Sequence, residues 1–341
     1  LSGEYGRIIT GIPEPRPKEK AALALAEGPY SQALGLWYAG EKFSPEAKAD
    51  VEAKVATMID VYKSRLQTAD WLAPETREKA ITKLNVITPH IGYPEKLPET
   101  YDKKIIDENL SLVENAQKLV EISIAHSWSK WNKPVDRSEW HMPAHMVNAY
   151  YDPQQNQIVF PAAILQAPFY DIAQSSSANY GGIGAVIAHE ISHAFDTNGA
   201  SFDENGSLKN WWTEDDYAAF KERTDKIVDQ FEGLDSYGAK VNGKLTVSEN
   251  VADLGGVACA LEAAKRDEDF SVREFFVNFA TIWRTKAREE YMQMLASVDV
   301  HAPAKWRTNV IVTNFDEFHK EFDVKEGDGM WRAPEDRVII W

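Results

Sequence analysis

The chain has 341 residues, of which 44% are hydrophobic and 26% charged, and its formal net charge at pH 7 is -16. This length can bury a sizeable core in one or two domains. The acidic balance disfavours nucleic acid and anionic membrane surfaces as partners. No apolar run is long enough to span a membrane, and a single cysteine, Cys259, excludes a disulfide within the chain.

The first 140 residues are predicted to be mainly helical. Ser44-Pro45-Glu46 is typical of a helix start, because Ser caps the free N–H groups, Pro suits the first turn and the carboxylate faces the positive end of the helix dipole. Apolar residues then recur at helical spacing to about Ala69. The other elements expected here are an extended connector over 1–17, helices over 18–26, 31–38, 74–88 and 107–128, and a loop over 90–94.

The character of the sequence changes near residue 144. Residues 146–151 and 157–160 are predicted to form two β-strands, since both are rich in β-branched and aromatic residues and turn-forming residues separate them. Helices dominate again beyond them, so we expect a mainly α fold with a small β-sheet (α+β). The later predicted helices cover 214–231 after a Thr213 cap, 247–264, and 272–291 after a capping box of Ser271 and Glu274.

An apolar stretch over 186–196 contains the pattern His189-Glu190-x-x-His193. On a helix, positions i and i+4 share one face, so the two imidazoles can bind a single Zn²⁺ ion. Glu190 would then lie beside the metal, where a general base can take a proton from water. The alternative is a buried helix whose histidines hydrogen-bond within the core. A metal would satisfy all three polar groups at once, and burial without partners would be costly.

A catalytic zinc site usually needs a third protein ligand, and Glu249 is the candidate. Glu249 and Asp253 are four residues apart in an apolar helix, so they share one face. Asp253 would then accept a hydrogen bond from the far nitrogen of a zinc-bound histidine. The alternative is a capping box between Thr246 and Glu249. The pair Gly255-Gly256 costs helix stability, and it indicates that another helix packs very close there.

Three further histidines could contribute to the site. His301 lies two residues after Asp299 in a predicted loop, so the aspartate could keep it protonated as a hydrogen-bond donor to an oxyanion. The alternative is an ordinary exposed loop histidine. His141 and His145 flank a proline before the first predicted strand. Either could supply a spare ligand, but no pattern around them supports that role.

Six short motifs follow one another along the chain. They are V-N-A-Y-Y from Val147, N-Q-I-V-F-P-A from Asn156, N-Y-G-G-I-G from Asn179, H-E-I-S-H-A-F-D from His189, E-N-x-A-D-x-G-G from Glu249 and D-x-H-x-P from Asp299. In this order they resemble the motifs of the neprilysin family of zinc endopeptidases, and most closely those of the cysteine-poor bacterial endopeptidase O type. The resemblance implies a zincin-type (gluzincin) catalytic domain over 141–341, and it implies that 1–140 supply connectors and part of a second, α-helical lid domain.

The resemblance also implies a role for each residue of the zinc site. His189, His193 and Glu249 would bind one zinc ion, Glu190 would act as the base, and Asp253 would orient a ligand. Asp196 and Asp299 match further family carboxylates that orient histidines.

Substrate contacts are implied in the same way. Asn148 and Ala149 would align an extended peptide on an edge strand, His301 would donate to the transition state, and Arg307 would hold a substrate carbonyl beyond the scissile bond. The hydrophobic S1′ pocket would suit bulky apolar side chains, with ordinary core packing as the alternative for its residues. These are Ile164, Phe169, Val186 and Trp283.

The expected function is hydrolysis of internal peptide bonds in short oligopeptides, on the amino side of bulky hydrophobic residues. Two alternatives are a hydrolase of another ester or amide, and a non-catalytic zinc-stabilised binding module such as a pseudo-protease or adhesin, against which the intact Glu190 argues. Family members have a comparably long upstream stretch, so the expected partners are oligopeptides and a missing N-terminal half of the same enzyme. The lack of disulfides fits a bacterial, cytoplasmic enzyme, with a secreted or cell-surface location as the alternative.

Overall fold

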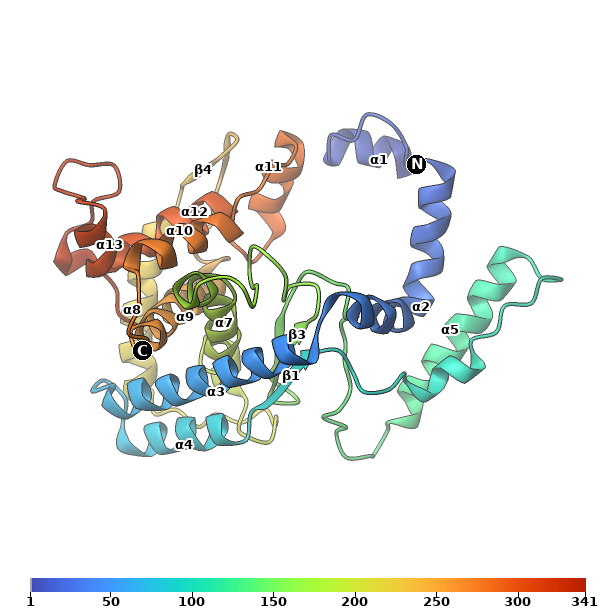
Figure 1. The fold of residues 1–341 in the computed structure, drawn as a ribbon, viewed down its shortest axis with the longest axis horizontal. Coiled ribbons are helices and arrows are strands. Elements are labelled where there is room, and N and C mark those ends of the chain that lie inside the picture. The colour runs from blue at the N-terminus through green and yellow to red at the C-terminus, as the bar shows by residue number, and fades with distance from the viewer. Residues whose placement is uncertain (1) are drawn as a thin grey trace.

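A three-stranded sheet lies at the centre of the protein in the computed structural model, which describes residues 2–341 (Figure 1). Its strands are β1 (Thr88–Gly92), β2 (Tyr150–Asp152) and β3 (Gln157–Pro161), in the order β1-β3-β2. The fully buried β3 pairs in parallel with β1 and antiparallel with β2, so β2 is an edge strand. Residues 90–92 pair with β3 and belong to β1, so the prediction of a loop over 90–94 is wrong for these three residues.

Helix α7 (Ala185–Ser192), which contacts strands β2 and β3, packs directly against α9 (Val247–Ala264). A β-carbon on Gly256 would lie 2.8 Å from the backbone nitrogen of His189, and one on Gly255 would lie 2.5 Å from the Trp341 ring. Only glycine allows such close approach. This confirms that a second helix packs close to the glycine pair, and the predicted bounds of α9 are confirmed as well.

Helices α3 (Pro45–Thr68) and α4 (Pro74–Asn85) run along the same side of the protein, below α7 in Figure 1. The Ser44 hydroxyl accepts a hydrogen bond from the backbone N–H of Ala47 at 3.1 Å, so the predicted cap is confirmed. Apolar side chains of α3 belong to the same buried cluster as those of α7 and α9. Much of the sequence before residue 92 therefore supports the central core.

The N-terminal elements match the prediction only in part. Helix α1 (Ser2–Ile9) replaces the first half of the expected connector, so that part of the prediction is wrong. Helix α2 (Lys18–Lys42) consists of two helical segments that meet at a kink, where Tyr30 leaves helical dihedrals (φ -112, ψ 15) directly after Pro29. The predicted division into two helices at this point is therefore confirmed, although each segment is longer than predicted. Helix α5 (Leu112–Ser129) starts at a capping box of Ser111 and Glu114. In Figure 1, α2 and α5 extend away from the body that holds the sheet, while α1 turns back to contact α11 (Glu289–Val298).

The C-terminal part is almost entirely helical. Helix α8 (Glu214–Phe231) has the predicted bounds and a capping box of Thr213 with Asp216. The helix predicted over 272–291 is wrong, because α10 (Val272–Ile282) ends where Trp283 leaves helical dihedrals and α11 (Glu289–Val298) begins separately. The remaining elements are η1 (Glu99–Lys103), α6 (Ser176–Asn179), the π-helical turn η2 (Tyr180–Gly184), η3 (Gly199–Ser201), β4 (Asp235–Ser236), β5 (Ala239–Lys240), α12 (Ala304–Asn309), η4 (Ile311–Asn314), α13 (Asp316–Glu321) and η5 (Pro334–Asp336).

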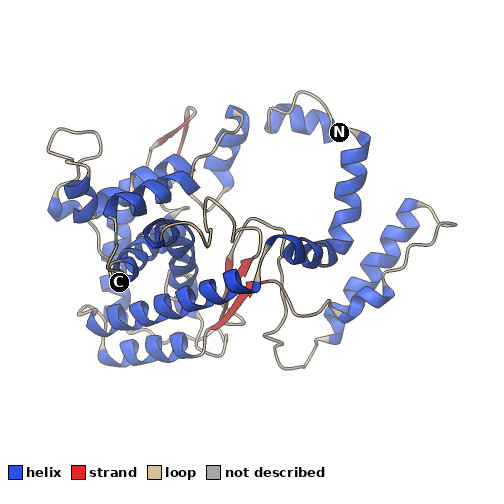
Figure 2. Cartoon of the chain, viewed as in Figure 1, coloured by secondary structure: helices blue, strands red, loops and turns tan. Residues whose placement is uncertain are grey.

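Helices thus predominate over two small sheets (Figure 2), which confirms the predicted mainly α class. Within residues 2–341, none of the helices combines the length and the apolar character needed to cross a bilayer.

Candidate metal centre and active site

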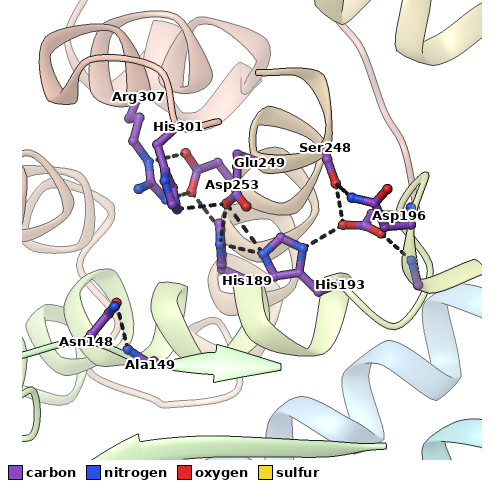
Figure 3. Close-up of polar contacts among 12 residues, drawn as sticks. Asn148, Ala149, His189, His193, Asp196, Ser248, Glu249, Asp253, His301 and Arg307 are labelled. Atoms are coloured by element: carbon purple, nitrogen blue, oxygen red, sulfur yellow. Dashed lines mark hydrogen bonds and ion pairs between the residues drawn. The ribbon is translucent and has the colours of Figure 1, made fainter. Parts of the chain in front are cut away.

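Helix α7 presents two imidazoles to one point. His189 lies in its last turn, and His193 is the C-cap residue directly after it. Their Nε2 atoms are 3.0 Å apart, and Figure 3 shows the two rings next to each other. The i, i+4 spacing predicted from the sequence therefore brings both rings to the same place.

A carboxylate orients each of the two rings through its other nitrogen. His189 Nδ1 donates to Asp253 Oδ1 at 2.8 Å, and His193 Nδ1 donates to Asp196 Oδ2 at 2.6 Å. These bonds place a hydrogen on each Nδ1 and leave the Nε2 lone pairs facing each other. Two facing lone pairs repel unless a cation lies between them.

Glu249, in the first turn of α9, completes the set. Its Oε2 lies 3.2 Å from His189 Nε2 and 3.5 Å from His193 Nε2, and one ligand atom from each of the three residues lies within 4.8 Å of the others. This oxygen is buried, and among the described residues none donates it a hydrogen bond of normal geometry. Two imidazole nitrogens and one orphaned carboxylate oxygen are a donor set that fits zinc.

The capping-box alternative for Glu249 is not what the structure shows. The Thr246 hydroxyl donates to the carbonyl of Asn242 at 3.2 Å and accepts from Asn250 Nδ2 at 3.0 Å, while the Glu249 carboxylate turns toward the histidines. Burial raises the pKa of Glu249, but the imidazoles of His189 and His193 lower it by more, so its pKa lies well below the usual range. The carboxylate is therefore ionised.

The three candidate ligands line a cavity with a volume of about 680 Å³, and Glu190 lines it as well. Its side chain is buried, and burial raises the pKa of the carboxyl above its usual value. A carboxylate with a raised pKa beside a metal centre has the chemistry of a general base. The structure thus brings Glu190 to the cavity that the three candidate ligands share.

Asp253 has a second partner that the sequence interpretation did not pair with it. Arg307 Nε donates to Asp253 Oδ2 and Arg307 Nη2 donates to Asp253 Oδ1, both at 2.7 Å. The guanidinium also stacks on Trp283, 3.8 Å from the ring centroid. Burial raises the pKa of Asp253, but Arg307 and His189 together outweigh it and lower the pKa to about 2. Because a buried carboxylate needs a cation as its partner, the apolar surroundings of Asp253 in the sequence were the feature from which such a partner could have been predicted.

His301 lies between Glu249 and Arg307 in Figure 3. Its Nδ1 donates to Asp299 Oδ1 at 2.8 Å, and its Nε2 lies 3.2 Å from Glu249 Oε2. Burial lowers the pKa of His301, but the carboxylates of Glu249 and Asp299 together outweigh it and raise the pKa above its usual value. The structure therefore places this loop histidine beside the candidate metal ligands.

The two residues expected on the edge strand lie just before it. Residues Asn148 and Ala149 precede Tyr150, the first residue of β2, so the predicted strand starts too early. The Oδ1 of exposed Asn148 accepts a local hydrogen bond from the N–H of Ala149 (3.0 Å), and the pairing of β2 with β3 starts only at Tyr150. Both residues still line the cavity, to the left in Figure 3.

The residues expected in the hydrophobic pocket line this cavity too. They are Ile164, Phe169, Val186 and Trp283. Val257, Phe279 and Ile282 join them, and the sequence interpretation missed these three because they resemble ordinary core positions. His141 and His145 lie elsewhere: His141 Nε2 is 2.7 Å from Gln155 Nε2, and His145 Nε2 is 2.7 Å from Glu27 Oε1.

Comparison with known proteins gives the family. Sequence models of peptidase family M13 match residues 148–338 and 1–94. The chain is 54% identical, over all 341 residues and 54% of the relative, to a neutral endopeptidase of Lactococcus lactis subsp. lactis. It is 76% identical over 275 residues, 81% of this chain and 49% of the relative, to a candidate zinc metalloproteinase of Streptococcus gordonii. It thus spans about half the length of these relatives.

Solved structures agree with the sequence matches. The fold superposes with a TM-score of 0.95 on PepO from Lactobacillus rhamnosis, at 41% identity, over 100% of this chain and 54% of that one. It superposes with a TM-score of 0.92 on the zinc metalloprotease Zmp1 of Mycobacterium tuberculosis in complex with an inhibitor, at 38% identity, over 99% and 53% of the two chains.

Proposed function

The chain belongs to peptidase family M13, as its sequence motifs predicted, and we propose that it carries the catalytic part of a zinc-dependent endopeptidase. The observation that supports this most is the convergence of His189, His193 and Glu249 on one point, with the buried Glu190 in the same cavity. The proposed reaction is hydrolysis of internal bonds in oligopeptides.

His189, His193 and Glu249 would hold one zinc ion. When bound, zinc would acidify a water molecule and polarise the scissile carbonyl. Glu190 would take the proton of the attacking water and pass it to the leaving nitrogen. Its buried position, which raises the pKa of the carboxyl, suits a group that must both accept and return a proton.

His301 would stabilise the negative charge that develops on the carbonyl oxygen. Asp299 accepts the hydrogen on Nδ1, and the raised pKa of the ring favours a second hydrogen on Nε2, which faces the site. Arg307 is held by both oxygens of Asp253, so its remaining nitrogen, Nη1, is free of that pair and can reach a substrate carbonyl.

The proposed substrate is an extended peptide with a bulky apolar residue after the scissile bond. Asn148 and Ala149 lead into the edge strand β2, and the free side of an edge strand can pair with an extended chain. The apolar wall formed by Phe169, Val186 and Trp283 supports the preference for a hydrophobic side chain.

We also propose that this catalytic part works together with the further half found in its relatives. Large apolar side chains on α2 and α5 are exposed, among them Trp37 (68%) and Trp128 (69%). These side chains leave apolar surface on both helices that a further part of the protein could cover.

The test is a metal and cleavage assay of the full-length protein. We expect one zinc per chain by mass spectrometry, cleavage of an internally quenched peptide, loss of cleavage with 1,10-phenanthroline, and recovery with added zinc. Stoichiometric zinc without cleavage of any member of a peptide library would indicate a zinc-stabilised binding module instead.

Substituting His301→Ala tests its proposed role. We expect kcat to fall by about 100-fold, since removing one oxyanion donor typically costs ~10²–10³-fold, and KM to change by less than about threefold. Steady-state kinetics measures both values, with His126→Ala as the control, because His126 pairs with Glu139 outside the cavity. A rise in KM at constant kcat would make His301 a ground-state contact.

A further inference from the structure

Lys83, in the last turn of α4, is buried to 1% exposure, which is rare for a lysine. Its Nζ donates three hydrogen bonds to backbone carbonyls, to Ala194 at 2.9 Å, Gly199 at 2.8 Å and Phe202 at 2.7 Å. An ammonium group has three hydrogens, so all of them are used. Burial lowers the pKa of Lys83 to about 7, while nearby carboxylates, Asp196 first, raise it.

These three carbonyls belong to the segment 194–202, which orients His193. Its Asp196 carboxylate accepts from His193 Nδ1 (2.6 Å), from the backbone N–H groups of Asn198 (2.8 Å) and Gly199 (2.7 Å), and from Ser248 Oγ (2.5 Å). His193 lies past the last residue of α7, so the regular helix does not hold it from both sides. Its ring position therefore depends on where this segment holds Asp196.

Gly199 brings the segment directly against His193. A β-carbon on Gly199 would lie 1.7 Å from the carbonyl oxygen of His193. The Gly199 N–H is bound by Asp196 and its carbonyl by Lys83, so the residue is fixed on both sides. Losing the ammonium would release one of these two attachments beside the candidate ligand.

The backbone carbonyl of Lys83 is linked through Asn156 to strand β2, on another side of the cavity. Its carbonyl accepts from Asn156 Nδ2 at 3.1 Å, and Asn156 Oδ1 accepts from the Tyr151 hydroxyl at 3.0 Å. Tyr151 lies in β2, and the Lys83 ammonium is 5.8 Å from its ring centroid. One residue thus joins the segment behind His193 to the strand next to Asn148 and Ala149.

From these contacts we propose that Lys83 is a positioning residue, whose ammonium fixes the segment 194–202 and thereby the Asp196 carboxylate and the His193 ring. The inference rests on the proposed zinc site, but not on peptidase activity. It assigns to α4 a part in metal binding, although α4 contributes no ligand.

The experiment measures zinc affinity in the full-length protein by competition with a chelator, at a temperature where circular dichroism shows every variant folded. Lys83→Met is expected to weaken zinc binding by about 10- to 100-fold, the range typical of residues that orient ligands. Lys79→Met, an exposed lysine in the same helix, is the control and should leave affinity unchanged. Should Lys83→Met fail to fold, Lys83→Gln, which retains two N–H donors, takes its place and must still weaken binding.

A double-mutant cycle separates positioning from general stabilisation. If Lys83 acts through Asp196, adding Lys83→Met to Asp196→Asn should weaken zinc binding little beyond Asp196→Asn alone. A lower melting temperature with unchanged zinc affinity, or fold-changes that multiply fully in the double variant, would overturn the proposal. Zinc binding without peptide cleavage would contradict the proposed function while leaving this result interpretable.

Discussion

Replacing Glu190 with glutamine is expected to lower kcat by about 1000-fold and to leave zinc bound. Glutamine has nearly the same shape, but its amide cannot take a proton from water, and general acid–base catalysis by one positioned side chain contributes ~10²–10⁴-fold. Glu190 is not one of the three residues whose ligand atoms converge, so the metal site should survive. Cleavage of a quenched peptide and zinc content by mass spectrometry measure the two effects.

The control for this substitution is Glu222→Gln, an exposed glutamate on α8 that lies outside the cavity. It should match the unaltered protein in both measurements. Activity of Glu190→Gln within tenfold of the unaltered protein would contradict the role of Glu190 as the base. Loss of zinc from this variant would show instead that Glu190 holds the metal site together.

The second large effect is expected from Glu249→Gln, which should weaken zinc binding by more than about 100-fold. Removing a ligand should cost more than removing a residue that only orients one, for which about 10- to 100-fold is typical. The neutral amide also lacks the negative charge with which the Glu249 carboxylate would attract a cation bound between the two imidazoles. Chelator competition gives the affinity, and peptide cleavage should fall with zinc occupancy.

Glu262→Gln is the matched control for Glu249→Gln, since it lies in the same helix but faces Arg65, 2.6 Å away, outside the cavity. Its substitution should leave zinc affinity unchanged. If Glu249→Gln bound zinc as tightly as the unaltered protein, the third ligand would have to come from another residue.

Elements with local start signals were predicted best from the sequence. The Thr213 cap defines the start of α8, and the predicted bounds of α8 and α9 are those of the structure. Strand β1 was missed because its pairing joins residues far apart, such as Thr88 and Gln157, and no local pattern reports that. The helix expected to continue past Trp283 ends there, where the indole lies against Arg307, again a contact between distant residues.

In the candidate site, too, local patterns could be predicted from the sequence, whereas contacts between distant residues could not. The spacing of His189 and His193 is visible in the sequence, whereas Glu249 fitted a local capping box equally well until the fold placed its carboxylate beside both rings. Lys83 carried no signal, because the groups that it binds are backbone carbonyls, which every residue has. Positions that act through the backbone of another segment are therefore found only from the structure.

Anomalous diffraction at the zinc edge, from crystals of the zinc-loaded full-length protein, tests the central claim most directly. The account predicts one peak, about 2.0–2.1 Å from the Nε2 atoms of His189 and His193 and about 2.0–2.2 Å from a carboxylate oxygen of Glu249. A peak at other residues, or a Glu249 carboxylate turned away from both imidazoles in the loaded protein, would contradict it.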